Sequence, residues 1–141
     1  LKKSSNAHIV TLSPPVNMNP KWFAGHLAYT ISKYNMSMIS YGLAAELKPY
    51  RIAANALWPK TTIATAAVNN LLGGEMLMKM SRTPEIIADS IWYLLQKSSV
   101  DCTGNFFIDE ELLAGEGITD LSKYAFVPGN TQFYPDLFVD K

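Results

Sequence analysis

Cysteine and unbalanced charge are the features that this sequence most lacks, and their absence excludes several classes of protein. The lone cysteine, Cys102, cannot form an internal disulfide or a thiolate metal cluster. We therefore expect an intracellular, reducing compartment, with peroxisome, mitochondrion and cytoplasm all left open. Twelve basic residues offset twelve acidic ones, which gives no electrostatic footprint for nucleic acid. No apolar run approaches the roughly 20 residues that span a bilayer, and no Asp, Glu, His or Cys set has metal-ligand spacing, so we predict neither a membrane span nor a metal site.

The overall composition is that of a globular protein. Of the 141 residues, 48% are hydrophobic and 17% are charged, which is the balance of a folded domain. The length suits one domain rather than two. Because the sequence begins at Leu1 without an initiator methionine, we interpret it as a fragment or trimmed piece of a longer chain.

Apolar runs and turn residues alternate along the chain in a regular order. Short apolar stretches predict three strands, and helical periodicity with capping signals such as Thr83-Pro84 predicts three helices. The predicted strands cover residues 8–13, 52–57 and 106–108, and the predicted helices cover residues 24–47, 84–97 and 110–114. This order favours right-handed βαβ crossovers and therefore an α/β fold with a parallel sheet.

A long connection over residues 60–82 separates the second strand from the next helix. We predict a helical piece over 64–72 that is broken by Gly73-Gly74. This glycine pair follows no strand and opens no clear helix, so it does not qualify as a phosphate-binding turn. The connection also carries alternating thioethers, which suit either an apolar substrate or plain packing: Met76, Met78 and Met80.

The predicted helix over 24–47 has two faces that can pack. Small residues and methionine dominate the first stripe, which contains Ala28, Ile31, Ser32, Asn35, Met38, Ile39 and Gly42. The second stripe contains Leu27, Tyr34, Met38, Tyr41 and Ala45. Two such faces are typical of a helix held between a sheet and either another helix or a partner subunit.

Tyr29 and Lys33 stand four residues apart, on one face of this predicted helix. A phenol with an ordinary pKa of about 10 is a poor base at neutral pH, but an ammonium group one turn away favours the phenolate. A tyrosine tuned in this way can exchange a proton with a substrate oxygen. Tyr93 and Lys97 copy the spacing, but only Tyr29 follows a buried strand and a Pro-rich loop, at the sheet edge where α/β proteins bind ligands. We interpret Tyr93 as a packing residue.

Three motifs, in matching order and spacing over residues 7–110, resemble the short-chain dehydrogenase/reductase family. Residues 28–34 resemble its catalytic helix, and residues 51–59 resemble the next strand, which in the family ends beside the nicotinamide. Residues 103–109 resemble its last strand, with Thr-Gly at the start and Asp at the end.

A second set of segments points more narrowly within the family. The segments are Ser13-Pro14-Pro15, residues 55–61 and residues 126–129. They are similar to the hydroxysteroid dehydrogenase-like branch, notably the members that elsewhere carry a sterol-carrier domain.

The resemblance implies a fold and a set of residue roles. The fold would be the C-terminal portion of a Rossmann-type doubly wound parallel sheet, and the reaction NAD(P)-dependent interconversion of a carbonyl and a secondary alcohol. Tyr29 would be the general acid/base, Lys33 would hydrogen-bond the nicotinamide ribose and tune Tyr29, and Ser13 would bind the substrate oxygen. Tyr29 as well as Lys33 would contact the cofactor, and its nicotinamide side would be lined by Pro59, Thr61, Thr62 and Thr65. The implied cofactor is NAD or NADP, with NADP preferred.

Three departures from the family pattern stand beside these roles. Pro14 occupies the place of the usual substrate-binding serine, so Ser13 is either that hydroxyl or an ordinary strand-end residue. Lys60 replaces the glycine that usually follows Pro59. The Gly-rich turn that seats the pyrophosphate precedes such a segment in the family and is absent here. We therefore expect the isolated segment to be inactive and to need the N-terminal half.

We divide residues 1–141, as one partial domain, into a catalytic helix at about 24–48, a substrate-lid region at about 60–82 and a tail at 115–141. The expected partners are a small carbonyl or alcohol substrate of apolar or lipid-like character and further copies of the chain in a homodimer or homotetramer. The alternative function is a non-catalytic scaffold of the same fold, used for assembly or lipid handling.

Overall fold

A computed structural model describes residues 1–139; residues 140 and 141, the end of the predicted tail, lie outside the described part. The chain divides into two compact units. The first comprises Leu1–Trp58 and Leu94–Phe107, and the second comprises Pro59–Tyr93 and the chain from Ile108 onward. Within residues 1–139, every helix falls short of the length and apolar character that crossing a bilayer demands.

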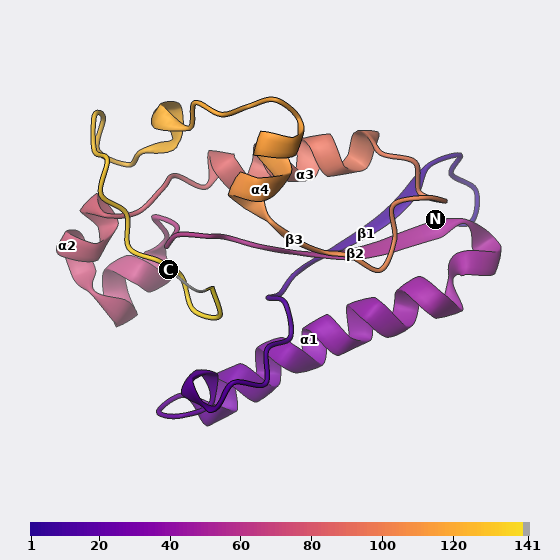
Figure 1. Cartoon of the computed structure of the whole chain (residues 1–141), viewed down its shortest axis with the longest axis horizontal. Helices are drawn as coiled ribbons and strands as arrows, with labels where there is room; N and C mark the ends of the chain where they lie inside the picture. The colour runs from indigo at the N-terminus through magenta and orange to yellow at the C-terminus, as the bar shows by residue number, and fades with distance from the viewer. Residues whose placement is uncertain (140–141) are drawn as a thin grey trace. The chain divides into compact units, whose positions relative to one another are not determined.

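Three strands form one sheet in the order β1-β2-β3 (Figure 1). They are β1 (Ala7–Leu12), β2 (Ile52–Trp58) and β3 (Phe106–Ile108). The first two run parallel, in a register from Ala7 opposite Ile52 to Leu12 opposite Leu57. All seven residues of β2 are buried, as expected for the central strand of a parallel sheet. The predicted α/β class and the three predicted strands are confirmed.

Helix α1 (Leu27–Glu46) packs against β1 and β2 within the first unit (Figure 1). It begins three residues later than predicted because Gly25 has a φ of 86° and His26 is not helical. The helix ends just before the short 3-10 turn Lys48–Tyr50, where the ring of Pro49 cannot continue an α-helix.

The buried face of α1 differs from both predicted stripes. It consists of Thr30, Tyr34, Ser37, Ser40 and Ala44. Polar side chains are buried there because the loop before the helix supplies acceptors: Ser37 Oγ donates to the Pro14 carbonyl over 2.6 Å, and the Tyr34 hydroxyl donates to the Asn17 carbonyl over 2.7 Å. Of the residues in the two predicted stripes, Tyr34 alone belongs to this buried face.

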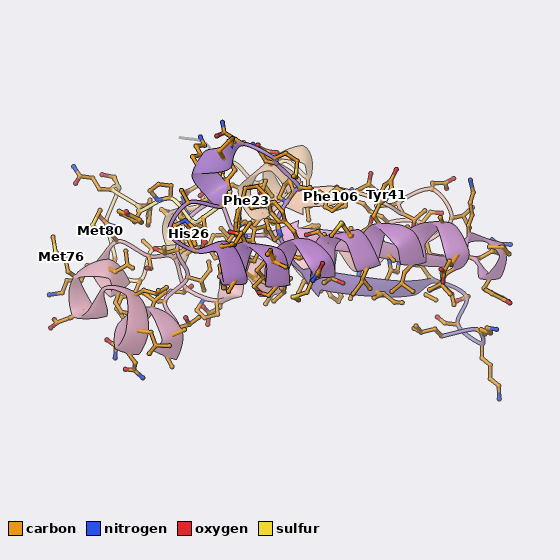
Figure 2. The ribbon with its side chains drawn as sticks, turned by 90° about the horizontal axis from the view of Figure 1, so that it is seen from below. Phe23, His26, Tyr41, Met76, Met80 and Phe106 are labelled. Carbon is orange, nitrogen blue, oxygen red and sulfur yellow. The ribbon has the colours of Figure 1, made fainter. Side chains whose placement is uncertain are left out.

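Many of the apolar residues predicted to pack are exposed instead. Large side chains more than two-fifths exposed on this helix are Leu27, Tyr29, Ile31, Met38, Ile39 and Tyr41. One of them has an aromatic neighbour: the Tyr41 ring stacks on Phe106, with centroids 6.0 Å apart (Figure 2).

The second unit has its own apolar core. Helices α3 (Glu85–Gln96) and α4 (Asp109–Gly115), both predicted, contribute Ile86 and Leu113, which pack with Tyr124. The lid region is more helical than predicted, since a π-helical turn (Val68–Leu72) is followed by α2 (Gly74–Lys79). The prediction that Gly73-Gly74 opens no helix is wrong: Gly74, at a φ of 59°, begins α2, a conformation that glycine adopts without a Cβ clash.

The C-terminal tail is paired with the chain that follows β2. Tyr134 accepts the Thr62 N–H, and Asp136 donates its N–H to the Lys60 carbonyl. Tyr134 also donates its N–H to the Met80 carbonyl, at the end of α2. Figure 1 shows the tail running beside α2. The tail is therefore part of the second unit's hydrogen-bonded framework.

Candidate active site

Lys33 reaches the carboxyl ends of the two parallel strands. Its Nζ donates to the carbonyl of Leu12, the last residue of β1, over 3.3 Å. The same Nζ lies 5.2 Å from the ring centroid of Trp58, the last residue of β2. Open α/β sheets bind ligands at this edge. The helix therefore carries an ammonium group to the carboxyl ends of β1 and β2.

Tyr29 lies one turn earlier, in the first turn of α1. Its side chain is 42% exposed, so it is accessible to a ligand rather than committed to the core. Side chains four residues apart share a helix face, which gives Tyr29 and Lys33 a common face. His26, just before the helix, is the N-cap residue and makes no side-chain capping bond.

Ser13 follows β1 directly and is fully buried. Its backbone N–H donates to the Leu57 and Thr11 carbonyls. Its Oγ has no hydrogen-bond partner among residues 1–139. A buried hydroxyl without a partner is costly, and it is a donor still available to a ligand oxygen. Ser13 and Lys33 are brought together at the end of β1, because the Lys33 ammonium contacts Leu12, the residue before Ser13.

The competing pair, Tyr93 and Lys97, has a different setting. Tyr93 is half-buried and packs against the core cluster of Ile86, Leu113 and Tyr124 in the second unit. Its interpretation as a packing residue agrees with this contact. Lys97 lies just beyond the end of α3, where its carbonyl accepts from Asn6.

The four residues predicted to line the cofactor follow β2 and belong to the second unit. The hydroxyls of the three threonines among them differ in the groups that they bind. Ser81 Oγ donates to the Leu77 carbonyl, so Thr62 must be the donor in the 2.8 Å bond between the Thr62 and Ser81 hydroxyls. Thr65 Oγ1 accepts the N–H of Val68, the first residue of the π-helical turn.

Thr61 is the exception among these threonines. It is 8% exposed, and its Oγ1 is buried without a hydrogen-bond partner within the described residues. Pro59, the remaining predicted residue, is half-buried at the start of the segment. Of the predicted set, Thr61 is therefore the residue whose hydroxyl is available to a ligand.

Asp109 is a buried residue that contacts the segment after β2, and its sequence pattern indicated no role for it. It is fully buried, and its Oδ1 accepts the Lys60 N–H over 2.9 Å and the Glu110 N–H over 2.7 Å. Burial raises the pKa of this carboxyl to about 6, against the opposing effect of the two backbone N–H groups. Its place at the end of the Thr-Gly strand was the available signal, but the contact with Lys60 is visible only in the fold.

Arg82 and Glu110 form a second buried polar contact in this unit. Arg82 Nε lies 2.7 Å from Glu110 Oε1, and Lys60 Nζ lies 3.8 Å from Glu110 Oε2. Cys102 belongs to the other unit and is half-buried. Burial raises the pKa of its thiol, which disfavours the reactive thiolate.

Comparison with known proteins gives relatives over the whole chain, although no family model matches it. Hydroxysteroid dehydrogenase-like protein 2 of Xenopus tropicalis is 55% identical over 141 residues, which are 100% of this chain and 33% of that protein. The human protein of the same name is 50% identical over the same length. The chain thus spans about a third of the length of the curated relatives it matches.

Solved structures agree with the sequence comparison. A structure described as a dehydrogenase from Xanthomonas campestris superposes with a TM-score of 0.91 at 45% identity, over 99% of this chain and 50% of that one. A short chain dehydrogenase from Mycobacterium thermoresistibile gives a TM-score of 0.87 at 47% identity, over 99% of this chain and 49% of that one. The fold seen here corresponds to half of each of these chains.

Proposed function

Because this chain belongs to the short-chain dehydrogenase/reductase family, we propose that the intact protein is an NAD(P)-dependent oxidoreductase that interconverts a carbonyl and a secondary alcohol. One observation carries the proposal: Lys33 reaches the carboxyl ends of β1 and β2, one helical turn from an accessible Tyr29. Residues 1–141 would form part of a single catalytic domain, completed by an N-terminal half that carries the pyrophosphate-binding turn.

The proposed roles follow from the chemistry of the side chains. A nicotinamide cofactor, when bound, supplies or accepts the hydride. Tyr29 transfers the proton to or from the substrate oxygen at its phenolic hydroxyl. The positive charge of Lys33 favours the phenolate and therefore lowers the free energy of proton transfer. Ser13 donates a hydrogen bond to the substrate oxygen, where negative charge develops during reduction.

The hydroxyls of Ser13 and Thr61 have no hydrogen-bond partner among the described residues, and each can donate to or accept from a ligand. We assign Thr61 as the nicotinamide-side hydroxyl, since Thr62 and Thr65 already bind protein groups. Pro59 and the backbone beside it would line the same side, and Lys33 would hold the ribose. NADP remains our preferred cofactor over NAD.

The lid region supports an apolar, lipid-like substrate. It exposes large apolar side chains on the π-helical turn and α2, and Figure 2 shows Met76 and Met80 on this part of the chain. Leu71 is 81% exposed, Leu72 70% and Met76 76%. Exposed apolar side chains gathered in one segment favour an apolar ligand or surface.

We also propose a homodimer or homotetramer assembled through α1. The support is the apolar face that the helix leaves exposed, including Ile31, Met38 and Ile39. Our proposal of a reducing compartment continues to rest on the single cysteine.

A panel of carbonyl and secondary alcohol substrates tests the proposed function in the intact protein. With NADH or NADPH, we expect turnover that increases with the apolar chain length of the substrate, measured as the change in absorbance of the reduced cofactor. The second candidate, a non-catalytic scaffold, is favoured by the complete burial of Ser13. Bound cofactor with no turnover for any member of a broad panel would select the scaffold.

Replacing Ser13 by alanine separates its chemical role from its structural one. We expect Ser13→Ala to lower kcat/KM by roughly 10²-fold, the effect of deleting one donor to a developing oxyanion. The thermal midpoint should stay the same or rise, because the variant removes a buried hydroxyl that has no partner. Steady-state kinetics and thermal denaturation of the intact protein measure the two effects.

Ser40→Ala is the matched control for this variant. Ser40 is also buried, at 1% exposure, and its Oγ is likewise without a partner in the described part of the chain. It lies three turns further along α1 than Tyr29. Equal kinetic effects of the two substitutions would show that Ser13 has no special role in the reaction.

A further inference from the structure

Asp109 connects the end of β3 to the chain that follows β2. Its Oδ1 accepts the N–H of Lys60 over 2.9 Å and that of Glu110 over 2.7 Å. Its Oδ2 is buried and has no hydrogen-bond partner within residues 1–139. Oδ1 thus accepts both hydrogen bonds, and one of them comes from Lys60, the residue directly after Pro59.

This contact completes the fixation of the segment around Thr61. At Lys60 the N–H is bound by Asp109 and the carbonyl accepts from Asp136. At Thr62 the N–H is bound by the Tyr134 carbonyl and the carbonyl accepts from the Arg82 N–H. Three of these four partners are backbone groups, and Asp109 is the one side chain. The position of the Thr61 hydroxyl between them is therefore set in part by a titratable group.

The ionised carboxylate is unfavourable for the stability of this fold. Burial raises the pKa of Asp109 to about 6 from its ordinary value of 3.8. The charged groups that act on it are Arg82, which favours the carboxylate, and Glu110, which disfavours it, while the backbone N–H of Lys60 also favours the carboxylate. Because the folded state binds this proton more tightly than the unfolded state does, protonated Asp109 stabilises the fold. This contribution is fully present below about pH 4 and is lost as the pH rises through 6. The carboxylate nevertheless holds two backbone N–H groups, one of them on the residue directly after Pro59.

We propose that Asp109 is a positioning residue for the cofactor: its carboxylate holds the Lys60 N–H and thereby fixes the Pro59–Thr61 backbone against the nicotinamide. The inference rests on the proposed function, because it requires that this segment line the cofactor. Protonation of Asp109 would also make cofactor binding depend on pH, because it converts the charge-assisted hydrogen bond from the Lys60 N–H into a weaker, neutral one. Cofactor affinity should then fall as the pH decreases through the range in which Asp109 titrates.

The test is a titration of the intact protein with NADPH and with NADH, followed by cofactor fluorescence between pH 5 and pH 7.5. For the wild type we expect the Kd to rise about ten-fold as the pH falls over this range, the difference between a charge-assisted and a neutral hydrogen bond. Asp109→Asn keeps the shape and one acceptor but cannot ionise. Its Kd at pH 7.5 should be about ten-fold higher than that of the wild type, with little dependence on pH.

Two further readouts distinguish positioning from folding. At saturating cofactor, kcat of Asp109→Asn should stay within about two-fold of wild type, so that the effect lies in the KM for the cofactor. The thermal midpoint should change little, because loss of a buried charge offsets the unpartnered amide. Asp120→Asn is the matched control: Asp120 also accepts a backbone N–H, from Ser122, but it is exposed. It should match the wild type in Kd at every pH.

The outcomes separate the inference from the function on which it rests. Equal affinity and equal pH dependence for Asp109→Asn and the wild type would overturn the inference alone. If Asp109→Asn does not fold, a wild-type Kd that is constant between pH 5 and pH 7.5 would overturn it instead. Failure of the wild type to bind either cofactor at any pH would contradict the proposed function, and the inference with it.

Discussion

Replacing Tyr29 by phenylalanine is expected to lower kcat of the intact protein by roughly 10²–10⁴-fold, the usual contribution of a general acid/base. The substitution removes only the hydroxyl that exchanges the proton with the substrate oxygen. Tyr29 is 42% exposed and lies in the first turn of α1, so the fold should be unaffected. The Kd for NADPH should change by no more than about two-fold, because the ribose contact is assigned to Lys33. Steady-state kinetics and cofactor fluorescence measure the two quantities.

Tyr93→Phe is the control that the chain itself provides. Tyr93 and Lys97 have the same spacing as Tyr29 and Lys33, and Tyr93 packs against an apolar cluster. We expect its turnover to equal that of the wild type. Wild-type turnover by Tyr29→Phe would show that the residue is not the acid/base and would favour the scaffold function.

Replacing Arg82 by alanine should cause the largest loss of stability among the substitutions considered. Arg82 is 7% exposed, donates to Glu110 and to the Leu121 carbonyl, and stacks over the Phe133 ring at 4.0 Å. Removing it leaves the half-buried carboxylate of Glu110 with Lys60, at 3.8 Å, as its one charged partner among residues 1–139. Breaking a buried pair by removing one partner costs about 3 kcal/mol or more. Chemical denaturation of the intact protein should show a decrease of this size in the free energy of unfolding.

Lys79→Ala provides the comparison for the buried pair. Lys79 and Glu75 form an ion pair of similar length, 2.8 Å, one turn apart on α2, but both side chains are mostly exposed. Water screens such a pair, so its loss should leave the denaturation midpoint unchanged. Equal effects of Arg82→Ala and Lys79→Ala would mean that the Arg82 contact is not a buried structural pair.

The order of strands and helices was predictable because it is written in local patterns. The apolar runs of β1 and β2, the Pro-rich loop before α1 and the turn at Thr103-Gly104 each act over a few residues. The choice of Tyr29 over Tyr93 also came from chain order, since only Tyr29 follows a strand at the sheet edge. The packing of Tyr93 in the second unit agrees with that choice.

Errors arose where a distant segment decides the environment of a residue. The buried face of α1 is lined by Thr30, Ser37 and Ser40 rather than by its methionine and isoleucine stripe. The carbonyl of Pro14, 23 residues earlier, makes burial of Ser37 favourable. Likewise, Gly73-Gly74 was interpreted from its glycines alone, whereas the positive φ of Gly74 allows α2 to begin there.

The sequence by itself determined that Tyr29 and Lys33 share a helix face after a strand, because helix and strand periodicity depend only on neighbours in the chain. It also shows a single cysteine and a formal net charge of zero. Only the tertiary structure decided which hydroxyls remain unpartnered, Ser13 and Thr61 among them, and that Asp109 holds Lys60. Those properties depend on hydrogen bonds between residues far apart in sequence, and no local pattern records such bonds.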